Sequence, residues 1–222
     1  MKPRAVVLLS GGLDSAVTLS LAVKNGYGCY PLAFDYGQRH IKEMSNARLL
    51  ARSLGLKLKI VDLKFTWKGS SLIDKARKLP KDRTLGRIKR GIPSTYVPAR
   101  NTVFLAVAAS YAEAIGADKI FIGAHSEDSS GYPDCRKEYL KAFDKTLKLG
   151  TKRGLEKMLG LGFPLIDKSK MEIVKLGIKL GVPFCFTWSC YEGGKHPCGR
   201  CDSCILRAKG FKKAKAADPI YE

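Results

Sequence analysis

Short apolar runs alternate with helical periods along most of this chain, and this alternation leaves few folds open. Strands are expected over 4–9, 29–34, 56–61 and 119–122, and helices over 14–24, 42–54, 101–115, 137–149 and 170–180. Elements that alternate at these lengths build a parallel sheet with helices on both faces. The sequence therefore predicts an α/β core. One apolar face is expected on the helix over 101–115, formed by Phe104, Val107, Ala108, Tyr111 and Ile115.

Two regions depart from this alternation. The segment 65–98 is basic and shows little periodicity, which is typical of an insertion or a mobile lid rather than of a core. The tail from residue 185 onward holds most of the seven cysteines. We therefore expect a main domain over 1–184, with 65–98 as its insertion, and a small metal-binding subdomain over 185–222.

The net charge of +20 is the strongest deviation in composition. Three readings remain open: a nucleic-acid partner, a lysine-rich surface of the kind found in heat-loving organisms, and attraction of an anionic nucleotide. The basic residues are spread along the chain rather than clustered, so the charge does not require direct nucleic-acid binding. No apolar run is long enough to cross a bilayer or to form a signal peptide, and we expect a cytoplasmic protein.

The string Ser10-Gly11-Gly12-Leu13-Asp14-Ser15 lies between the first expected strand and the first helix. Ligands of open parallel sheets bind beyond the carboxyl ends of the strands. Two glycines let the backbone approach an anion, and the start of a helix supplies unpaired N–H groups. Asp14 is expected to cap the helix or to help hold Mg²⁺ between phosphates. The string therefore predicts a phosphate-binding loop, although a plain tight turn remains the alternative.

Four cysteines crowd near the end of the chain: Cys190, Cys198, Cys201 and Cys204. Seven, two and two residues separate them in turn. Four thiolates on tight turns can enclose a tetrahedral Zn²⁺ ion with no open position, which predicts a structural zinc site. An iron–sulfur cluster is the rival, and His196 in place of Cys198 is a further option. Cys29 and Cys185 are expected to be core residues.

Further candidates follow the other expected strands. Arg100 enters a helix and can reach an anion, and Lys170 at another helix start can counter phosphate charge. After the fourth strand, Asp134 matches the donor edge of a guanine-like base, and Tyr132 can stack on its ring. Catalytic roles for Cys135 and His125 remain open.

Taken together, five strings resemble the 7-cyano-7-deazaguanine synthase (QueC) family of pyrophosphatase-loop (PP-loop) ATP enzymes, over residues 6–211. They are the Ser-Gly-Gly-Leu-Asp-Ser loop, Phe34–His40, Tyr96–Asn101, Ser130–Arg136, and Trp188–Tyr191 with the cysteine cluster. The resemblance implies a Rossmann-like fold of the adenine nucleotide alpha hydrolase type, with a small C-terminal zinc-binding subdomain. It also suggests a homodimer. The segment 65–98 carries no family signature.

The resemblance further implies a ligase that joins ammonia to 7-carboxy-7-deazaguanine. ATP would adenylate first the acid and then the amide, and the nitrile product would supply queuosine or archaeosine biosynthesis. Asp14, Arg100 and Lys170 would be catalytic, with ATP, Mg²⁺ and Zn²⁺ as cofactors. The substrate would contact Tyr132, Asp134, Cys135 and Arg136. The nucleotide would lie along Leu8, Leu9, Ser10, Gly11, Gly12, Leu13, Asp14, Ser15, Ala16, Val17 and Thr18.

Two alternatives remain. A PP-loop tRNA-thiolating or other tRNA-modifying adenylating enzyme shares the loop and would account for the positive charge, but it would need a catalytic cysteine, for which Cys135 is the candidate. A zinc-dependent nucleic-acid-binding module would show salt-dependent RNA binding without ATP turnover.

Overall fold

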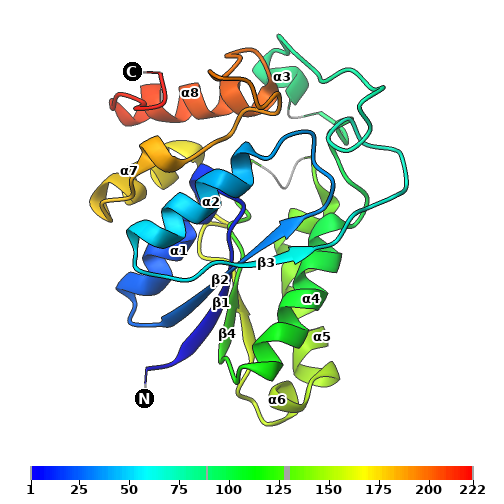
Figure 1. Cartoon of the computed structure of the whole chain (residues 1–222), viewed down its shortest axis with the longest axis vertical. Helices are drawn as coiled ribbons and strands as arrows, with labels where there is room; N and C mark the ends of the chain where they lie inside the picture. The colour runs from blue at the N-terminus through cyan, green and yellow to red at the C-terminus, as the bar shows by residue number, and fades with distance from the viewer. Residues whose placement is uncertain (1, 89, 128–130, 222) are drawn as a thin grey trace.

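The computed structural model describes residues 2–88, 90–127 and 131–221. In this part of the chain five parallel strands form one sheet in the order β3-β2-β1-β4-β5 (Figure 1). The strands are β1 (Arg4–Leu8), β2 (Gly28–Asp35), β3 (Lys59–Asp62), β4 (Lys119–Phe121) and β5 (Gly160–Gly162). The predicted parallel α/β fold is confirmed.

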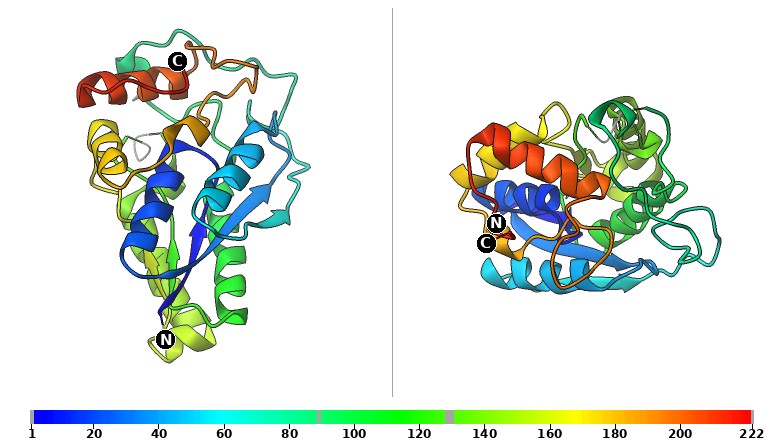
Figure 2. Two further views of the ribbon diagram at one scale, coloured as in Figure 1. Left: turned by 60° about the vertical axis from the view of Figure 1, so that its left-hand side comes forward. Right: turned by 90° about the horizontal axis from the view of Figure 1, so that it is seen from above.

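The longer helices cover both faces of this sheet (Figures 1 and 2). On one face lie α1 (Leu13–Lys24), α2 (Lys42–Ser53), α7 (Lys170–Lys179) and α8 (Asp202–Ala214); on the other lie α4 (Arg100–Ala114) and α5 (Lys137–Gly150). The short helices are α3 (Leu85–Ile88) and α6 (Lys152–Leu155). β1 lies at the centre, where Val7 faces the first layer and Val6 the second, and both are fully buried. Burial on both sides explains why this strand is a continuous apolar run.

The order of the strands determines where a ligand can bind. The chain moves outward from β1 through β2 to β3, and then crosses to β4 on the other side of β1. Such a reversal opens a crevice at the carboxyl ends of the strands. The segment after β1, which carries the Ser-Gly-Gly string, ends in this crevice.

Several sequence expectations need correction. On α4 the fully buried face is formed by Leu105, Ala108, Ala109 and Ala112, with Asn101 at its start, and not by the expected larger side chains. Of those five only Ala108 is buried, while the others pack partly buried at the margin of the same cluster. The small residues allow α4 to lie close against the sheet. Cys185 is exposed and not in the core, whereas Cys29 is buried as expected.

Strand β5 was missed because its sequence, Gly-Leu-Gly, carries almost no strand signal. The structure gives the reason for its second glycine. A Cβ atom at Gly162 would lie 2.4 Å from Cε1 of Phe121 on the neighbouring strand β4. Helix α8 was also missed, since the cysteines dominate the pattern at its start.

The segment 65–98 contains one short helix, α3, and is attached to the core at several points. Phe65 and Val97, near its two ends, are buried in the second apolar layer. The guanidinium of Arg39 donates hydrogen bonds to the backbone carbonyls of Ser71 at 2.7 Å and of Asp74 at 3.0 Å. These contacts fix the first half of the segment against the loop that follows β2.

The C-terminal region begins with the cysteine loop and continues as α8, which lies across the top of α7 (Figure 1). Phe211 of α8 belongs to the same apolar cluster as α1 and α7. Arg207, only 2% exposed, forms an ion pair with Asp218 at 2.7 Å and donates to Thr187 at 2.7 Å. The boundary at 184/185 stays a prediction, because the tail shares its apolar contacts with the main layer.

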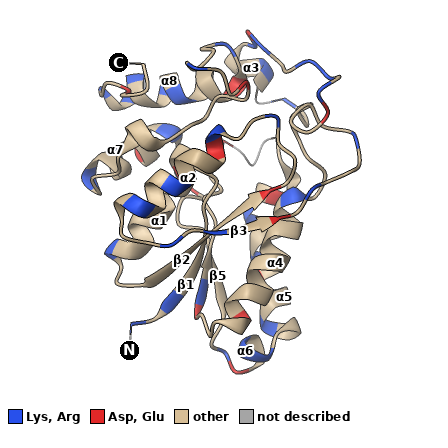
Figure 3. Ribbon diagram, viewed as in Figure 1, with Lys and Arg blue, Asp and Glu red and all other residues tan. Residues whose placement is uncertain are grey.

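Basic residues occur on nearly every element rather than on one face (Figure 3), as the sequence indicated. Each helix that the structure describes is too short or too polar to cross a lipid bilayer.

Candidate active site

A cavity of about 260 Å³ opens at the carboxyl edge of the sheet. The segments after β1, β2 and β4 form its floor, and α2, α4 and the loop before the cysteine cluster form its walls. Of the nucleotide segment expected over 8–18, the cavity is lined by Leu8, Leu9, Ser10, Gly12, Leu13, Asp14 and Ser15. Ala16 and Val17 lie in the apolar core, and the Thr18 hydroxyl donates to the Asp14 carbonyl at 2.9 Å.

The Ser-Gly-Gly turn is held open by its own hydroxyl groups. Ser15 Oγ accepts a hydrogen bond from the Ser10 backbone N–H at 3.2 Å and donates to the Gly12 carbonyl at 3.0 Å. Ser10 Oγ accepts from the Gly12 N–H at 3.2 Å. Gly12, the N-cap residue of α1, has no side chain that could cap this helix. The first turn of α1 therefore presents its N–H groups and positive dipole to the cavity, as an anion site requires.

Gly11 determines how closely α2 approaches this turn. Its φ of +87° favours glycine, and a Cβ atom there would lie 2.1 Å from the Glu43 carbonyl oxygen and 2.9 Å from the Ala47 nitrogen. Both contacts are backbone atoms of α2, which cannot rotate away as a side chain can. The loop and the first turns of α2 are therefore in direct contact.

Asp14 pairs with Lys170, although the two lie 156 residues apart in the chain. Lys170 Nζ lies 2.8 and 2.9 Å from the two carboxylate oxygens and 2.8 Å from Nε2 of His125. Burial by itself would raise the pKa of Asp14, but the charge of Lys170 and then of His125 outweighs it and lowers that pKa. Asp14 is thus an ionised carboxylate paired with Lys170 in this site.

Arg100 enters the cavity from the start of α4. Its guanidinium lies 5.6 Å from the centre of the Tyr36 ring and makes only long contacts, at 3.5 Å to the Tyr36 hydroxyl and 3.4 Å to Asn101 Oδ1. Its buried Nε has no hydrogen-bond partner in the described residues. A buried donor without a partner costs free energy, and a bound anion would satisfy it. The prediction that Arg100 meets an anion fits this geometry.

Glu43 is a cavity residue that the sequence analysis did not single out. It lies in the first turn of α2 and lines the cavity together with Asp14. Burial raises its pKa to about 7, although the charge of Arg100 opposes this shift. One signal in the sequence pointed to Glu43: it lies four residues after Arg39, which belongs to the motif at the carboxyl end of the second strand.

The four expected substrate residues separate into two groups. Tyr132 and Cys135 line the cavity. Cys135 Sγ accepts a hydrogen bond from Asn101 Nδ2 at 3.1 Å. Asp134 is buried, and its carboxylate accepts from the Asn101 backbone N–H at 2.9 Å, at the start of α4. Arg136 is exposed and does not line the cavity. Ser130 of the same string lies outside the described residues.

The four cysteines meet in one place. The sulfur atoms of Cys190, Cys198, Cys201 and Cys204 all lie within 4.8 Å of one another, and three of these residues are buried. A tetrahedral Zn²⁺ with Zn–S bonds near 2.3 Å places its ligands about 3.8 Å apart, so this donor set fits a metal ion. Backbone N–H groups point at the sulfurs as well, for example from Cys198 to Cys190 Sγ at 3.3 Å. Among described residues no histidine joins the group.

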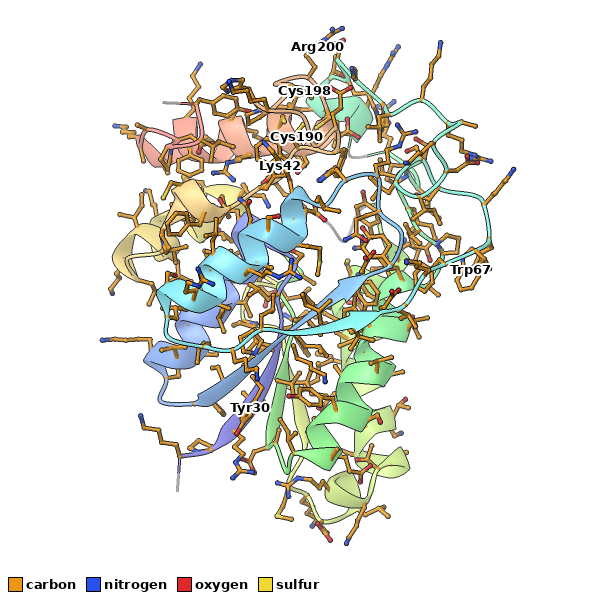
Figure 4. The ribbon with its side chains drawn as sticks, in the orientation of Figure 1. Tyr30, Lys42, Trp67, Cys190, Cys198 and Arg200 are labelled. Atoms are coloured by element: carbon orange, nitrogen blue, oxygen red, sulfur yellow. The ribbon has the colours of Figure 1, made fainter. Side chains whose placement is uncertain are left out.

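The cysteine loop also contacts the phosphate loop. The Trp188 backbone N–H donates to the Gly11 carbonyl at 2.9 Å, and the Trp188 indole donates to the Cys190 carbonyl at 2.8 Å. Lys42, at the start of α2, lies 3.9 Å from the centre of the Trp188 ring and donates to the Lys195 carbonyl at 2.8 Å. Figure 4 shows Lys42 directed toward the loop that carries Cys190 and Cys198. A metal in the cysteine cluster would therefore stabilise one wall of the cavity.

The cysteine loop also holds the insertion. Lys81 forms an antiparallel bridge with Cys201, and the Asp82 N–H donates to the Arg200 carbonyl at 2.8 Å. Arg83 pairs with Asp202 at 2.9 Å. The middle of the segment 65–98, which was predicted to be an insertion or a mobile lid, is thus attached to the cysteine cluster.

Comparison with known proteins places the chain in a family. The sequence profile described as "Queuosine biosynthesis protein QueC" matches residues 4–215. The chain belongs to the QueC family. The Thermoplasma acidophilum 7-cyano-7-deazaguanine synthase is 50% identical over 222 residues, covering 100% of this chain and 93% of that protein. The Trichodesmium erythraeum 7-cyano-7-deazaguanine synthase is 46% identical over 221 residues, covering 98% of this chain and 99% of that protein.

Solved structures support the fold of this QueC chain. A 4-thiouridine synthetase–RNA complex with bound ATP superposes with a TM-score of 0.50 and 22% identity, covering 96% of this chain and 50% of that one. The NMN synthetase of Francisella tularensis also has a TM-score of 0.50, at 15% identity, covering 97% of this chain and 88% of that one. At these identities the likeness concerns the fold alone, and it agrees with the sheet described above.

Proposed function

We propose that this QueC-family chain is an ATP-dependent ligase that converts 7-carboxy-7-deazaguanine and ammonia to 7-cyano-7-deazaguanine. Two relatives of 50% and 49% identity, matched over 93% and 91% of their own length, carry the name of this synthase. The observation that carries the proposal is the open cavity itself. A loop of backbone donors lies on one side, and Arg100, with an unpartnered buried Nε, lies on another.

The chemistry explains why ATP is needed. A carboxylate is a poor electrophile because an oxide ion is a very poor leaving group. Transfer of AMP to the carboxylate oxygen creates a good leaving group, which ammonia can displace to form an amide. A second adenylation, now on the amide oxygen, allows AMP to leave again and the nitrile to form. One site can carry out both rounds because the adenylated oxygen is in the same place.

The residues have distinct roles in this proposal. The turn from Ser10 to Ser15 holds the β- and γ-phosphates through backbone N–H groups and hydroxyls. Lys170, held by Asp14 at 2.8 Å, supplies positive charge beside that turn. Arg100 stabilises the negative charge that develops on the transferred phosphoryl group or on the substrate carboxylate. Tyr132 offers a ring face at the cavity wall for the deazaguanine.

Two metal ions belong to the proposal. The four-cysteine cluster would hold Zn²⁺ in a closed structural site that supplies rigidity and no chemistry. The Asp14 carboxylate fits a Mg²⁺ site near the phosphates, since its lowered pKa keeps it ionised. Mg²⁺ would neutralise charge on the departing pyrophosphate.

We also propose that the enzyme acts on the free base in the cytoplasm, without direct nucleic-acid binding, and that it forms a homodimer. The dispersed positive charge and the resemblance to the family support these points. The product would supply queuosine or archaeosine biosynthesis.

Mass spectrometry tests the proposal most simply. The protein is incubated with ATP, Mg²⁺, ammonium and 7-carboxy-7-deazaguanine, and nitrile, amide and AMP are measured. Two AMP for each nitrile is the expected result. Nitrile with ADP in place of AMP would refute adenylation but retain the substrate. No turnover of 7-carboxy-7-deazaguanine would refute the proposed function.

The tRNA-thiolating alternative makes a different prediction for Cys135. A thiolating enzyme needs this sulfur as a nucleophile, whereas in a nitrile synthase it would shape the cavity, where it accepts a hydrogen bond from Asn101. The variant Cys135→Ala should therefore still form nitrile, with a raised KM. Complete loss of turnover in a folded Cys135→Ala protein would favour covalent catalysis.

A further inference from the structure

The proposed reaction removes three protons from one nitrogen atom. In the first round the lone pair of ammonia forms the C–N bond, the C–O bond to AMP breaks with its electron pair going to AMP, and the nitrogen loses one proton. In the second round the amide oxygen takes a new AMP. The nitrogen then loses its last two protons as AMP departs, which leaves the nitrile. Each of these steps needs a proton acceptor beside the reacting carbon.

Two carboxylates line the cavity in the described part of the chain, Asp14 and Glu43. Asp14 is stabilised in its ionised form, because both of its oxygens lie within 2.9 Å of Lys170 Nζ. Proton transfer to Asp14 would also break the pair that holds Lys170 beside the loop. Glu43 differs, because no cation of the described residues lies within ion-pair distance of its carboxylate.

The position of Glu43 is fixed by the phosphate loop. Its carbonyl oxygen is so close to Gly11 that no Cβ atom fits between them. Arg100, the anion-binding candidate, is the charged group that acts on the Glu43 carboxyl through space. Glu43 therefore lines the same cavity as the phosphate loop and Arg100, the two groups expected to bind the phosphates and the substrate carboxylate.

We propose that Glu43 is the general base of this site, accepting protons from the nitrogen in the amide-forming and nitrile-forming steps and releasing them to solvent. This inference rests on the proposed function. The raised pKa of about 7 suits the role, since a base that titrates near the working pH both accepts and releases protons readily.

The other titratable or charged groups of the cavity do not match this role as well. Tyr36 has a pKa raised by burial to about 12, and burial lowers the pKa of His40, which packs against Gly193 of the cysteine loop. Arg39 is engaged with backbone carbonyls of the insertion. Among the residues that the structure describes, the titratable or charged side chains that line the cavity are Asp14, Tyr36, Arg39, His40, Glu43, Arg100, Tyr132, Cys135 and Tyr191.

The variant Glu43→Gln tests the inference, because the amide keeps the shape but cannot accept a proton. Glu138→Gln is the matched control. Glu138 is also the second residue of its helix, α5, and also follows a lysine, but it is exposed. Two rates are measured for each protein: substrate-dependent ATP–pyrophosphate exchange without ammonium, which reports adenylation, and amide plus nitrile formation with ammonium.

Glu43→Gln should retain exchange while amide and nitrile formation fall about 100-fold or more, the size typical of a lost general base. At a fixed concentration of free NH₃, the rate of amide formation in the unchanged protein should rise with pH through about 7. That limb should disappear in Glu43→Gln and persist in Glu138→Gln. Retained exchange also shows that the variant is folded and binds ATP.

Two results would overturn the inference. Amide formation at the unchanged rate in Glu43→Gln would show that another group takes the protons, and the proposed function would stand. Loss of both exchange and amide formation in Glu43→Gln would assign Glu43 to the binding of nucleotide, Mg²⁺ or substrate. Absence of exchange and of AMP in the unchanged protein is a separate result, which refutes the proposed function itself.

Discussion

Replacement of Gly11 by alanine should damage this protein more than the same change at another glycine with nearly the same φ. Gly11 has a φ of +87° and Gly26 a φ of +85°. At Gly26 an added Cβ would meet nothing within 4 Å, whereas at Gly11 it would lie 2.1 Å from the Glu43 carbonyl oxygen. Gly26→Ala thus isolates the cost of the left-handed conformation, and the difference between the variants isolates the clash with α2.

The magnitudes follow from these contacts. A left-handed conformation costs a residue with a Cβ atom about 1–2 kcal/mol, which is the expected loss for Gly26→Ala. Forcing an extra carbon against packed backbone adds about 1–3 kcal/mol, so Gly11→Ala should lose about 2–5 kcal/mol. For a chain of this size each kcal/mol lowers Tm by about 2–4 °C. Since α2 or the loop must shift, Gly11→Ala should also bind ATP more weakly.

Thermal unfolding and calorimetric ATP titration of both variants test this prediction. Gly26→Ala should have nearly unchanged ATP affinity. Equal losses of stability in the two variants, or unchanged ATP affinity in Gly11→Ala, would refute the close contact between the loop and α2.

Three further predictions concern charge and metal. In a rapid-quench assay, Lys170→Met should lower the rate of AMP formation about 10²–10³-fold, as expected for the loss of a preorganised charge. A loss below tenfold would exclude a role of Lys170 in stabilising the transferred phosphates. Cys204→Ser should lose its bound zinc, whereas elemental analysis of the unchanged protein should find one ion per chain. The variant should also bind ATP more weakly, because Trp188 links the cysteine loop to the phosphate loop. Normal ATP affinity in a zinc-free variant would contradict this coupling. The lowered pKa of Asp14 contributes stability that is present above its ordinary value near 4 and is lost as pH falls through the lowered value. Urea unfolding from pH 6 to 2.5 should show this loss, and Asp14→Asn should flatten it; an unchanged slope in the variant would contradict the pairing with Lys170.

The sequence was sufficient for the features that depend on local pattern. The loop from Ser10 to Ser15 follows a buried strand and begins a helix, so its place at the sheet edge follows from topology alone. The cysteine cluster follows from spacing, since cysteines separated by two residues on tight turns bring their sulfur atoms together.

Other features depend on contacts between distant segments, which a local pattern does not report. The pairing of Lys170 with Asp14 and His125 arises because α7 packs on α1, and neither helix carries a sign of the other. Glu43 lies in the first turn of α2, where an acidic residue stabilises any helix, so its type and position give no sign of a functional role. Its place in the cavity follows from Gly11, 32 residues earlier, which draws α2 against the loop.

The apolar face of α4 shows the same limit in another form. Mostly large side chains were expected inward, but three of the four apolar buried residues are alanines, with Leu105 as the one large side chain among them. Phe104 instead stacks on Phe34 at 4.0 Å and lines the cavity. Hydrophobicity alone cannot distinguish a residue that fills the core from one that lines a site.

The central claim is that the turn from Ser10 to Ser15 holds the triphosphate of ATP. A crystal structure with Mg²⁺ and an ATP analogue that resists cleavage between the α- and β-phosphates tests it directly. The β- and γ-phosphates should accept hydrogen bonds from the backbone of this turn, with the α-phosphorus directed toward Arg100 and Glu43. A nucleotide bound elsewhere, with the turn making no phosphate contact, would contradict the account.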